Sequence, residues 1–330
     1  MSEKIKILML GDGRSGKTCY MLGMYAAMPT NSKFSLKATD PDQGTRLSAS
    51  WSTIVNGLDT QRWPPGTDQP KTYNFEFSYG YKPLIEFEWL DYRGTSMSSL
   101  SISSEDNVEA LRDYANQCNG LFFCISGEYL SFPINNANIT RIITQTKADR
   151  MANYLQDLGV NRRPDEKKSF PIVILVTKYD YCFHRPKEEL IEDVKQMFLP
   201  LFAQNSGWLV MICPTSLGKE LAQDRAKGTI EPFNLHVPVA FLLYCVLGEK
   251  ARSQDEKARI IADKLDEWED SNPIVQWMNR VKIRELEKSL EQMENQLQNT
   301  KQMMNILARE QDLSSTHIYM SGKRVKIDLS

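Results

Sequence analysis

Apolar positions between residues 5 and 252 follow two patterns that together predict a layered α/β domain. Continuous apolar runs, typical of strands covered on both faces of a sheet, occupy 5–10, 120–125, 171–176 and 208–213. Alternation of apolar and polar residues predicts two further strands at 71–79 and 84–90. Stretches of helical composition lie at 19–28, 105–117, 139–158, 187–202 and 236–252. Strands that alternate with helices predict a doubly wound, mostly parallel sheet.

The hydrophobic pattern changes near the C-terminus. From Ile283 to Leu307 apolar or small residues recur in steps of three and four, which is a heptad seam along one helix. Two interpretations remain open: a coiled coil that forms a homodimer through residues 283–307, or a long helix that lies on the preceding domain or on a partner protein. The tail after His317 predicts a small hairpin around Ser321 and Gly322, or a segment that extends a partner's sheet.

These patterns predict three parts of the chain. Residues 1–252 form the α/β domain, 253–312 a helical linker followed by the heptad helix, and 313–330 the tail. The polar stretch 31–60 receives no predicted element and is expected to be an insertion within the first part.

A glycine-rich loop joins the first predicted strand to the first predicted helix. It reads Gly-Asp-Gly-Arg-Ser-Gly-Lys-Thr at positions 11–18, which is the G-x-x-x-x-G-K-[ST] pattern in a strand–loop–helix context. Glycines allow backbone N–H groups to surround a phosphate at a helix N-terminus. The expected ligand-binding residues are Asp12, Gly13, Arg14, Ser15, Gly16, Lys17, Thr18 and Cys19. The alternative is a glycine-rich turn that binds nothing.

Three shorter motifs follow later strands. Asp91-Tyr92-Arg93-Gly94 closes the strand at 84–90, in the D-x-x-G pattern that holds Mg²⁺ and contacts a γ-phosphate in phosphate-loop proteins. Thr177-Lys178-Tyr179-Asp180 follows the strand at 171–176, where a carboxylate can accept from both N1–H and N2–H₂ of guanine. Ser216 and Leu217 follow the strand at 208–213, where backbone amides can contact the base. The alternative for each motif is an ordinary polar turn.

The order of these motifs, GDGRSGKT, DYRG, TKYD and TSLG, resembles a Ras-like GTPase of the translation-factor-related P-loop class over about residues 3–252. The resemblance implies that Lys17 and Thr18 bind phosphates and Mg²⁺, and that Asp91 holds the metal through water. It also implies that Gly94 contacts the γ-phosphate. The base would be bound by Lys178, Asp180, Ser216 and Leu217.

The resemblance further implies a threonine that ligates Mg²⁺ only in the GTP state. Thr67 is the chosen residue because it precedes the strand at 71–79. The other candidates are Thr39, Thr45, Thr53, Thr60 and Thr72. The Trp-Pro-Pro-Gly-Thr segment around this position is also similar to GTPases of bacterial multi-gene conflict systems.

Two positions depart from the family pattern. Thr95 stands where the family usually has a Gln that orients water, so intrinsic hydrolysis is expected to be slow unless another group positions the water. Arg14 stands where Gly is typical. One hypothesis is that Arg14 supplies positive charge between the β- and γ-phosphates in the manner of an arginine finger. The alternative is a solvated side chain, or one paired with an acid.

The composition of the chain argues against two classes of partner, nucleic acids and anionic membranes. With 40 basic and 42 acidic residues the formal charge is -2, which provides no electrostatic footprint for nucleic acid or an anionic membrane. The six cysteines have no CxxC spacing, no signal-peptide pattern opens the chain, and the longest apolar run, at 237–247, is too short to span a bilayer. These features favour a cytoplasmic protein with reduced thiols. The expected function is a Mg²⁺-dependent GTPase switch that acts on a protein partner. The alternative is a GTP-binding scaffold with little turnover that assembles through its C-terminal helix.

Overall fold

The computed structural model describes residues 4–31, 33–57, 59–66, 70–80, 82–92, 111, 113–161, 170–269, 273–310 and 316–326. The chain divides into two compact units. The first comprises Met1–Leu242 together with Ser315–Lys326, and the second comprises Leu243–Ser314 and Ile327–Ser330. The segment Leu243–Ser314 is therefore preceded and followed along the chain by segments of the first unit.

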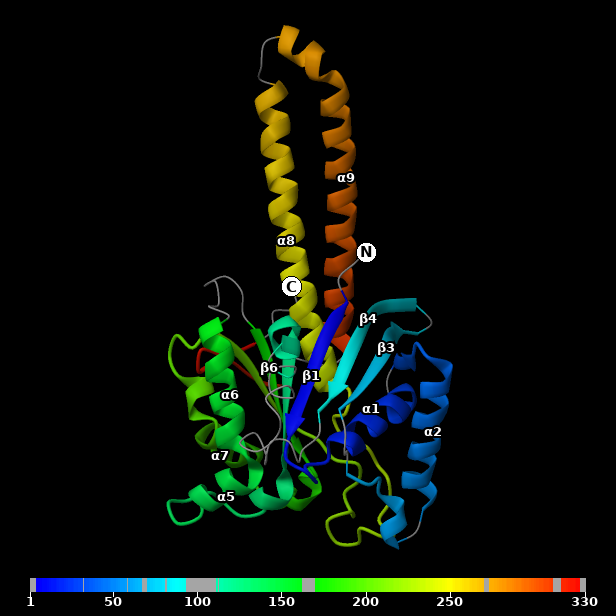
Figure 1. The fold of residues 1–330 in the computed structure, drawn as a ribbon, viewed down its shortest axis with the longest axis vertical. Coiled ribbons are helices and arrows are strands. Elements are labelled where there is room, and N and C mark those ends of the chain that lie inside the picture. The colour runs from blue at the N-terminus through cyan, green and yellow to red at the C-terminus, as the bar shows by residue number, and fades with distance from the viewer. Residues whose placement is uncertain are drawn as a thin grey trace. The chain divides into compact units, whose positions relative to one another are not determined.

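Among the described residues of the first unit, nine strands form one mixed sheet in the order β2-β3-β4-β1-β5-β6-β7-β8-β9 (Figure 1). The strands β4, β1, β5, β6 and β7 run parallel, and antiparallel pairs flank this centre on both sides. The predicted α/β class with a parallel central sheet is confirmed. The strand bounds are β1 Ile5–Gly11, β2 Phe34–Ala38, β3 Lys71–Tyr79, β4 Lys82–Asp91, β5 Gly120–Ser126, β6 Phe170–Thr177, β7 Trp208–Pro214, β8 His317–Met320 and β9 Lys323–Val325.

Helices connect the strands much as the pattern predicts. The predicted helix at 139–158 is divided at Lys147, whose backbone is left-handed with φ 59°. The helix predicted at 105–117 lies largely outside the described residues. The α-helices are α1 Lys17–Asn31, α2 Pro41–Asn56, α5 Ile139–Thr146, α6 Ala148–Asn161, α7 Lys187–Met197, α8 Val237–Glu269 and α9 Pro273–Glu310. Short 3₁₀ helices occur at η1 Asp59–Arg62, η2 Gly127–Leu130, η3 Tyr179–Cys182 and η4 Leu199–Phe202.

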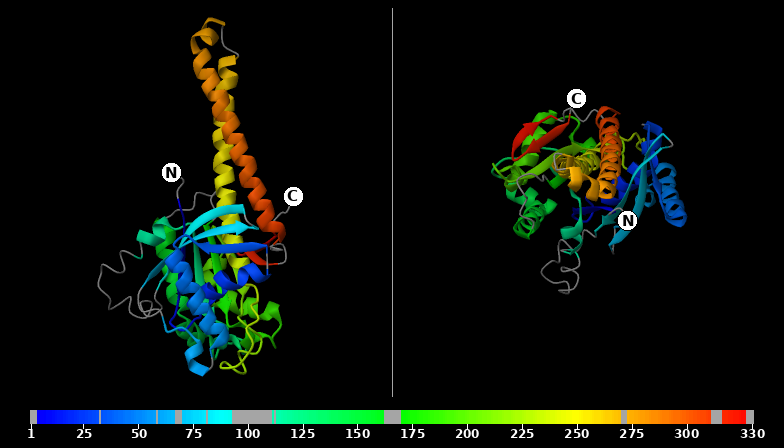
Figure 2. Two further views of the ribbon diagram at one scale, coloured as in Figure 1. Left: turned by 90° about the vertical axis from the view of Figure 1, so that its right-hand side faces the viewer. Right: turned by 90° about the horizontal axis from the view of Figure 1, so that it is seen from above.

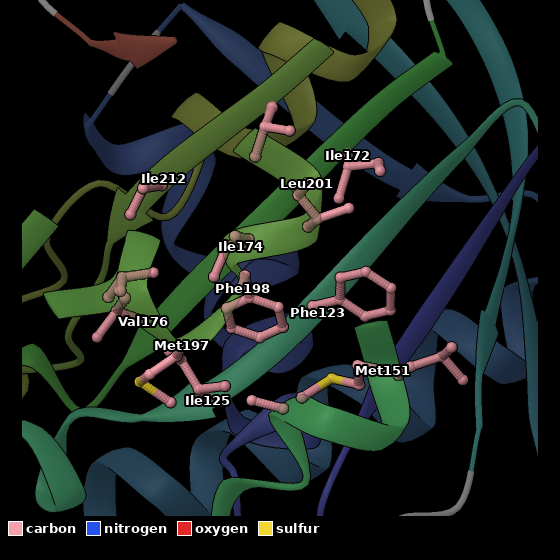
Figure 3. Close-up of a cluster of buried hydrophobic side chains, with 14 of the residues drawn as sticks. Phe123, Ile125, Met151, Ile172, Ile174, Val176, Met197, Phe198, Leu201 and Ile212 are labelled. Atoms are coloured by element: carbon pink, nitrogen blue, oxygen red, sulfur yellow. The ribbon is translucent and has the colours of Figure 1, made fainter. Parts of the chain in front are cut away.

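Side chains from the two faces of the sheet form two separate parts of the core. On one face, Phe123 of β5 stacks on Phe198 beside α7, with ring centroids 6.1 Å apart and planes at 12° (Figure 3). On the other face, Tyr20 of α1 lies 6.3 Å from the rings of Trp89 and Phe122. Because successive side chains of a strand point to opposite faces, helices on both sides of the sheet are held by burial. This packing fixes the carboxyl ends of the parallel strands, where the motifs lie.

The insertion at 31–60 contains a strand and a helix that the hydrophobic pattern did not predict. β2 pairs with β3, and α2 buries Leu47 and Ile54. Signals for the helix are present in the sequence: Asp40 caps the N-terminus by accepting from the Asp42 N–H at 3.0 Å, and Pro41 occupies the first turn.

The described part of the tail, residues 316–326, belongs to the first unit. β8 and β9 pair antiparallel around Ser321 and Gly322, and β8 pairs with β7, so the hairpin extends the sheet of its own chain. Gly322 has φ 77°, and a Cβ at this position would meet the carbonyl of Phe202 at 2.0 Å. Glycine is required at this turn by both its backbone conformation and the lack of space.

In the second unit, the part of α8 from Leu243 and the helix α9 run side by side (Figures 1 and 2). From Ile283 to Gln302 the predicted seam of α9 is its least exposed stripe and the other faces are exposed, whereas near the C-terminal end Met303, Ile306 and Ala308 are also partly or fully buried. α8 has a matching stripe of buried residues at Ala251, Gln254, Ala258 and Leu265. A Cβ at Gly248 would lie 3.4 Å from Cε of Met304, so the helices approach closely there. The seam thus faces α8 of the same chain, and dimerisation through residues 283–307 stays a prediction.

None of the helices in the described residues is long and apolar enough to cross a membrane.

Candidate nucleotide-binding site

The glycine-rich loop connects β1 to α1 and closes around the amine of Lys17. Lys17 Nζ donates to the carbonyl oxygens of Gly11 at 2.8 Å and Asp12 at 2.9 Å. The residue is 5% exposed. Burial lowers the pKa of Lys17, and the neighbouring Cys124 and Asp91 partly oppose this shift. The loop therefore holds a desolvated cation on backbone carbonyls, which anionic phosphate oxygens can replace.

Thr177, at the end of β6, contacts the glycine-rich loop through its hydroxyl group. Its hydroxyl donates to the carbonyl of Ser15 and lies 3.2 Å from the carbonyl oxygen of Ile125. Gly16 has φ 86°, and a Cβ there would lie 3.1 Å from Thr177 Oγ1. The close approach of β6 to the loop thus depends on glycine at position 16. Thr177 belongs to a motif found in the sequence, but this supporting role was not predicted.

Arg14 lies at the tip of the loop. Its backbone is left-handed, with φ 69°, a conformation that costs a residue with a side chain on the order of 1–2 kcal/mol. Its side chain is exposed, and a Cβ added at the adjacent Gly13 would meet nothing within 4 Å. The side chain of Arg14 is therefore open to solvent.

Thr18 and Asp91 form the candidate metal site. Thr18 Oγ1 lies 3.3 Å from Asp91 Oδ2, although the residues are 73 positions apart. The register of the parallel strands β1 and β4 pairs Asp91 with Met9, which places this fully buried carboxylate beside the glycine-rich loop. A hydroxyl and a carboxylate are the hard oxygen donors that Mg²⁺ prefers, so the residues fit this ion. Thr67 and Gly94 lie outside the described residues.

Asp180 and Ser216 meet at the ends of the neighbouring strands β6 and β7. Ser216 Oγ donates to Asp180 Oδ1 at 2.8 Å. Burial raises the pKa of Asp180, while the hydrogen bond from Ser216 opposes that shift. Backbone hydrogen bonds of 3.2 and 2.8 Å pair Ser216 with Phe233 and fix the loop. The carboxylate is thereby oriented by a buried hydroxyl on a separate strand.

Lys178 forms an ion pair. Its backbone is left-handed, with φ 50°, and its Nζ lies 2.6 Å from Glu128 Oε2. Although burial raises the pKa of Glu128, the hydrogen bond and charge of Lys178 lower it overall. Glu128 was not predicted from the sequence; it follows β5 by two residues and is brought to Lys178 by the parallel pairing of β5 with β6. Lys178 is thus held at the same strand end as Asp180.

A pocket joins the loop to the Asp180 motif and contains about 540 Å³ of empty space, including space open to solvent. Cys19 lines this pocket. Burial raises the pKa of its thiol to about 11, so the thiol is protonated at neutral pH. The predicted residues in its lining are Gly16, Cys19, Lys178, Asp180, Ser216 and Leu217. The lining also includes residues that were not predicted from the sequence, namely Tyr20, Trp63, Tyr181, Leu221 and Arg225.

Similar proteins are found among solved structures, whereas no protein-family model and no curated protein matches the chain. Among solved structures it is similar to the Arl6 BBS3 small GTPase of Trypanosoma brucei, with 12% identity, coverage of 74% of this chain and 98% of that one, and a TM-score of 0.38. It is also similar to the ADP-ribosylation factor-like protein/Sar1 GTPase of Encephalitozoon cuniculi, with 13% identity, coverage of 77% and 84%, and a TM-score of 0.37.

A third similar structure is the GTPase-like domain of Ski7 from S. cerevisiae. It has 16% identity, a TM-score of 0.38, and coverage of 69% of this chain and 47% of that one. All three TM-scores are below 0.5, so the case for a function rests on the residues of this chain.

Proposed function

We propose that the chain binds Mg²⁺ and GTP and hydrolyses GTP to GDP and phosphate. The observation that supports this function best is the convergence of separate sequence motifs from β1, β4, β6 and β7 at one end of the parallel sheet. Ligands of open α/β sheets bind at the carboxyl ends of the strands. The pocket between Gly16 and Asp180 connects the phosphate end to the base end.

Guanine selectivity follows from the carboxylate of Asp180. An ionised carboxylate only accepts hydrogen bonds, and guanine offers N1–H and N2–H₂ as adjacent donors. Adenine has no such pair of donors at the corresponding edge. Ser216 orients the carboxylate through its 2.8 Å hydrogen bond, and Lys178 lies next to it in the pocket lining.

Phosphate binding is assigned to the loop residues Asp12 to Cys19, with Lys17 as the main charged contact. Its amine would exchange the carbonyls of Gly11 and Asp12 for the β- and γ-phosphate oxygens. Thr18 and Asp91 would hold Mg²⁺, which when bound neutralises charge that develops on the phosphates. Lys17 and Thr18 are adjacent at the start of α1, and Asp91 lies beside Thr18, so the fold itself brings the charged group and the metal-binding groups together.

The switch itself is assigned to Thr67 and to the segment that follows Asp91. In this proposal GTP orders Thr67 and the segment that includes Gly94, and a protein partner binds the ordered state. Membership of the translation-factor-related class, a role in bacterial conflict systems and a cytoplasmic location remain predictions. The scaffold alternative has less support, since the seam it would use for assembly faces α8.

The first test is nucleotide-dependent stability. With Mg²⁺ present and GDP at about 100 times its Kd, binding is expected to add about 2.7 kcal/mol to the free energy of unfolding. We expect the melting temperature to rise by a few degrees with GDP and to stay unchanged with ADP at the same concentration. Equal shifts with both nucleotides would contradict the assignment of Asp180.

Arg14 provides a second test, of the catalytic step. If its guanidinium stabilises charge on the phosphates, Arg14→Ala should lower kcat for GTP by about 100-fold while GDP affinity changes little. Arg14→Lys should retain part of the activity, and Arg14→Gly, which suits the positive φ, separates backbone strain from loss of charge. Turnover by Arg14→Ala at the wild-type rate would show that the side chain is merely solvated.

A further inference from the structure

Arg62 is a buried cation that joins two segments far apart in the sequence. It is 3% exposed, and its guanidinium donates to three backbone carbonyls. Nε donates to Ile54 of α2 at 2.5 Å, and the same terminal nitrogen, Nη1, donates to Ala226 at 3.2 Å and Gly228 at 2.8 Å. These hydrogen bonds connect α2 and the segment before β3 to the loop that follows Ser216 and Leu217.

The loop is shaped to receive this guanidinium. The side chain of Asp224 accepts from the N–H groups of Ala226 at 3.0 Å and Lys227 at 2.9 Å, which forms a tight turn. A Cβ at Gly228 would lie 2.6 Å from the carbonyl oxygen of Asp224. Because each donor on a buried guanidinium needs an acceptor, the carbonyls of this turn and Arg62 depend on one another.

The next residue, Trp63, contacts the same loop and also lines the pocket. Its indole Nε1 donates to the carbonyl of Arg225 at 3.2 Å. The guanidinium carbons of Arg62 and Arg225 lie 5.4 and 5.6 Å from the ring of Trp63, within the range of cation–π attraction. Trp63 and Arg225 both line the pocket, together with Lys178 and Asp180.

We infer that Arg62 is a positioning residue that controls how long the proposed nucleotide stays bound. Its contacts hold Trp63 and Arg225 in place as the outer wall of the pocket. These two residues must move aside before the nucleotide leaves. The inference rests on the proposed function, and it couples the insertion that precedes Thr67 to the loop that holds the base-binding Ser216. The sequence resemblance assigns no role to Arg62 or Arg225, and it includes Trp63 only as part of the Trp-Pro-Pro-Gly-Thr segment.

Release of tritiated GDP from the full chain, chased with excess unlabelled GDP in Mg²⁺, tests this wall. Trp63→Leu removes the ring and Arg62→Met removes the bonds to the three carbonyls, and each is expected to speed release by about tenfold, equivalent to the loss of one hydrogen bond or cation–π contact. Arg225→Met should give a smaller increase in the same direction. Arg46→Met, an exposed arginine on α2, is the matched control and should release GDP at the wild-type rate.

The double variant Arg62→Met/Trp63→Leu separates positioning from general weakening. If Arg62 acts through Trp63, the double variant should release GDP no faster than the faster single variant. If Arg62→Met fails to fold, the release rates of Trp63→Leu and Arg225→Met still test the inference, because both variants leave the buried guanidinium of Arg62 intact. Wild-type release rates in both, or fully additive effects in the double variant, would overturn the inference. A wild-type chain that retains no GDP would instead refute the proposed function itself, before any variant is compared.

Discussion

Lys17→Ala is expected to lower phosphate release from GTP by about 1000-fold, the largest effect of any single change, because Lys17 supplies the buried positive charge that balances the phosphates. The amine is 5% exposed and already aimed at the carbonyls of Gly11 and Asp12, so the contact needs no rearrangement of the chain. The measurement is steady-state phosphate release at saturating GTP. Lys37→Ala, an exposed lysine on β2, is the matched control and should behave as wild type.

Loss of activity in Lys17→Ala must be separated from loss of folding. Burial of the amine lowers its pKa, which means that the folded chain disfavours the charged form. The uncharged variant Lys17→Met should therefore melt at or above the wild-type temperature without nucleotide, yet release no phosphate. Wild-type turnover in either variant would remove Lys17 from the mechanism.

Asp180→Asn is expected to exchange the base preference of the site. The amide can still accept from Ser216, so the 2.8 Å contact that orients the side chain is retained. Its NH₂ group, however, opposes the donors of guanine. Loss of two hydrogen bonds to a charged acceptor costs about 3 kcal/mol, which is roughly a 100-fold fall in kcat/KM for GTP.

Xanthine nucleotides provide the complementary measurement. Xanthine has a carbonyl in place of the guanine amino group, so the amide of the Asp180→Asn variant can donate to it. We expect kcat/KM for xanthosine triphosphate to rise as that for GTP falls. Asp149→Asn, an exposed carboxylate on α6, should change neither value. Unchanged selectivity in Asp180→Asn would show that the base is bound elsewhere.

Much of the placement of these residues follows from local sequence. Lys17, Asp91 and Asp180 each lie shortly after an apolar strand, and in a parallel sheet such positions share one edge. The contact between Thr18 and Asp91 could thus be anticipated across 73 residues. The heptad spacing of α9 likewise matched the stripe that is least exposed.

Other features depend on contacts that no local pattern encodes. Arg62 is a charged residue in a polar stretch, a composition that ordinarily indicates an exposed loop. It is buried because carbonyls 164 and 166 residues away accept its hydrogen bonds. Glu128 reaches Lys178 only through strand pairing. The partner of the α9 seam was also missed, because only Leu265 among the four residues of the buried stripe of α8 is a large apolar residue.

Phosphate release by the purified chain, from GTP and from ATP in parallel, is the decisive measurement for the proposed GTPase. We expect release from GTP that greatly exceeds release from ATP, that stops when EDTA removes Mg²⁺, and that falls by about 1000-fold in Lys17→Ala. Equal release from both nucleotides would contradict guanine recognition by Asp180. Release at the wild-type rate in Lys17→Ala would contradict the assignment of the phosphates to the loop.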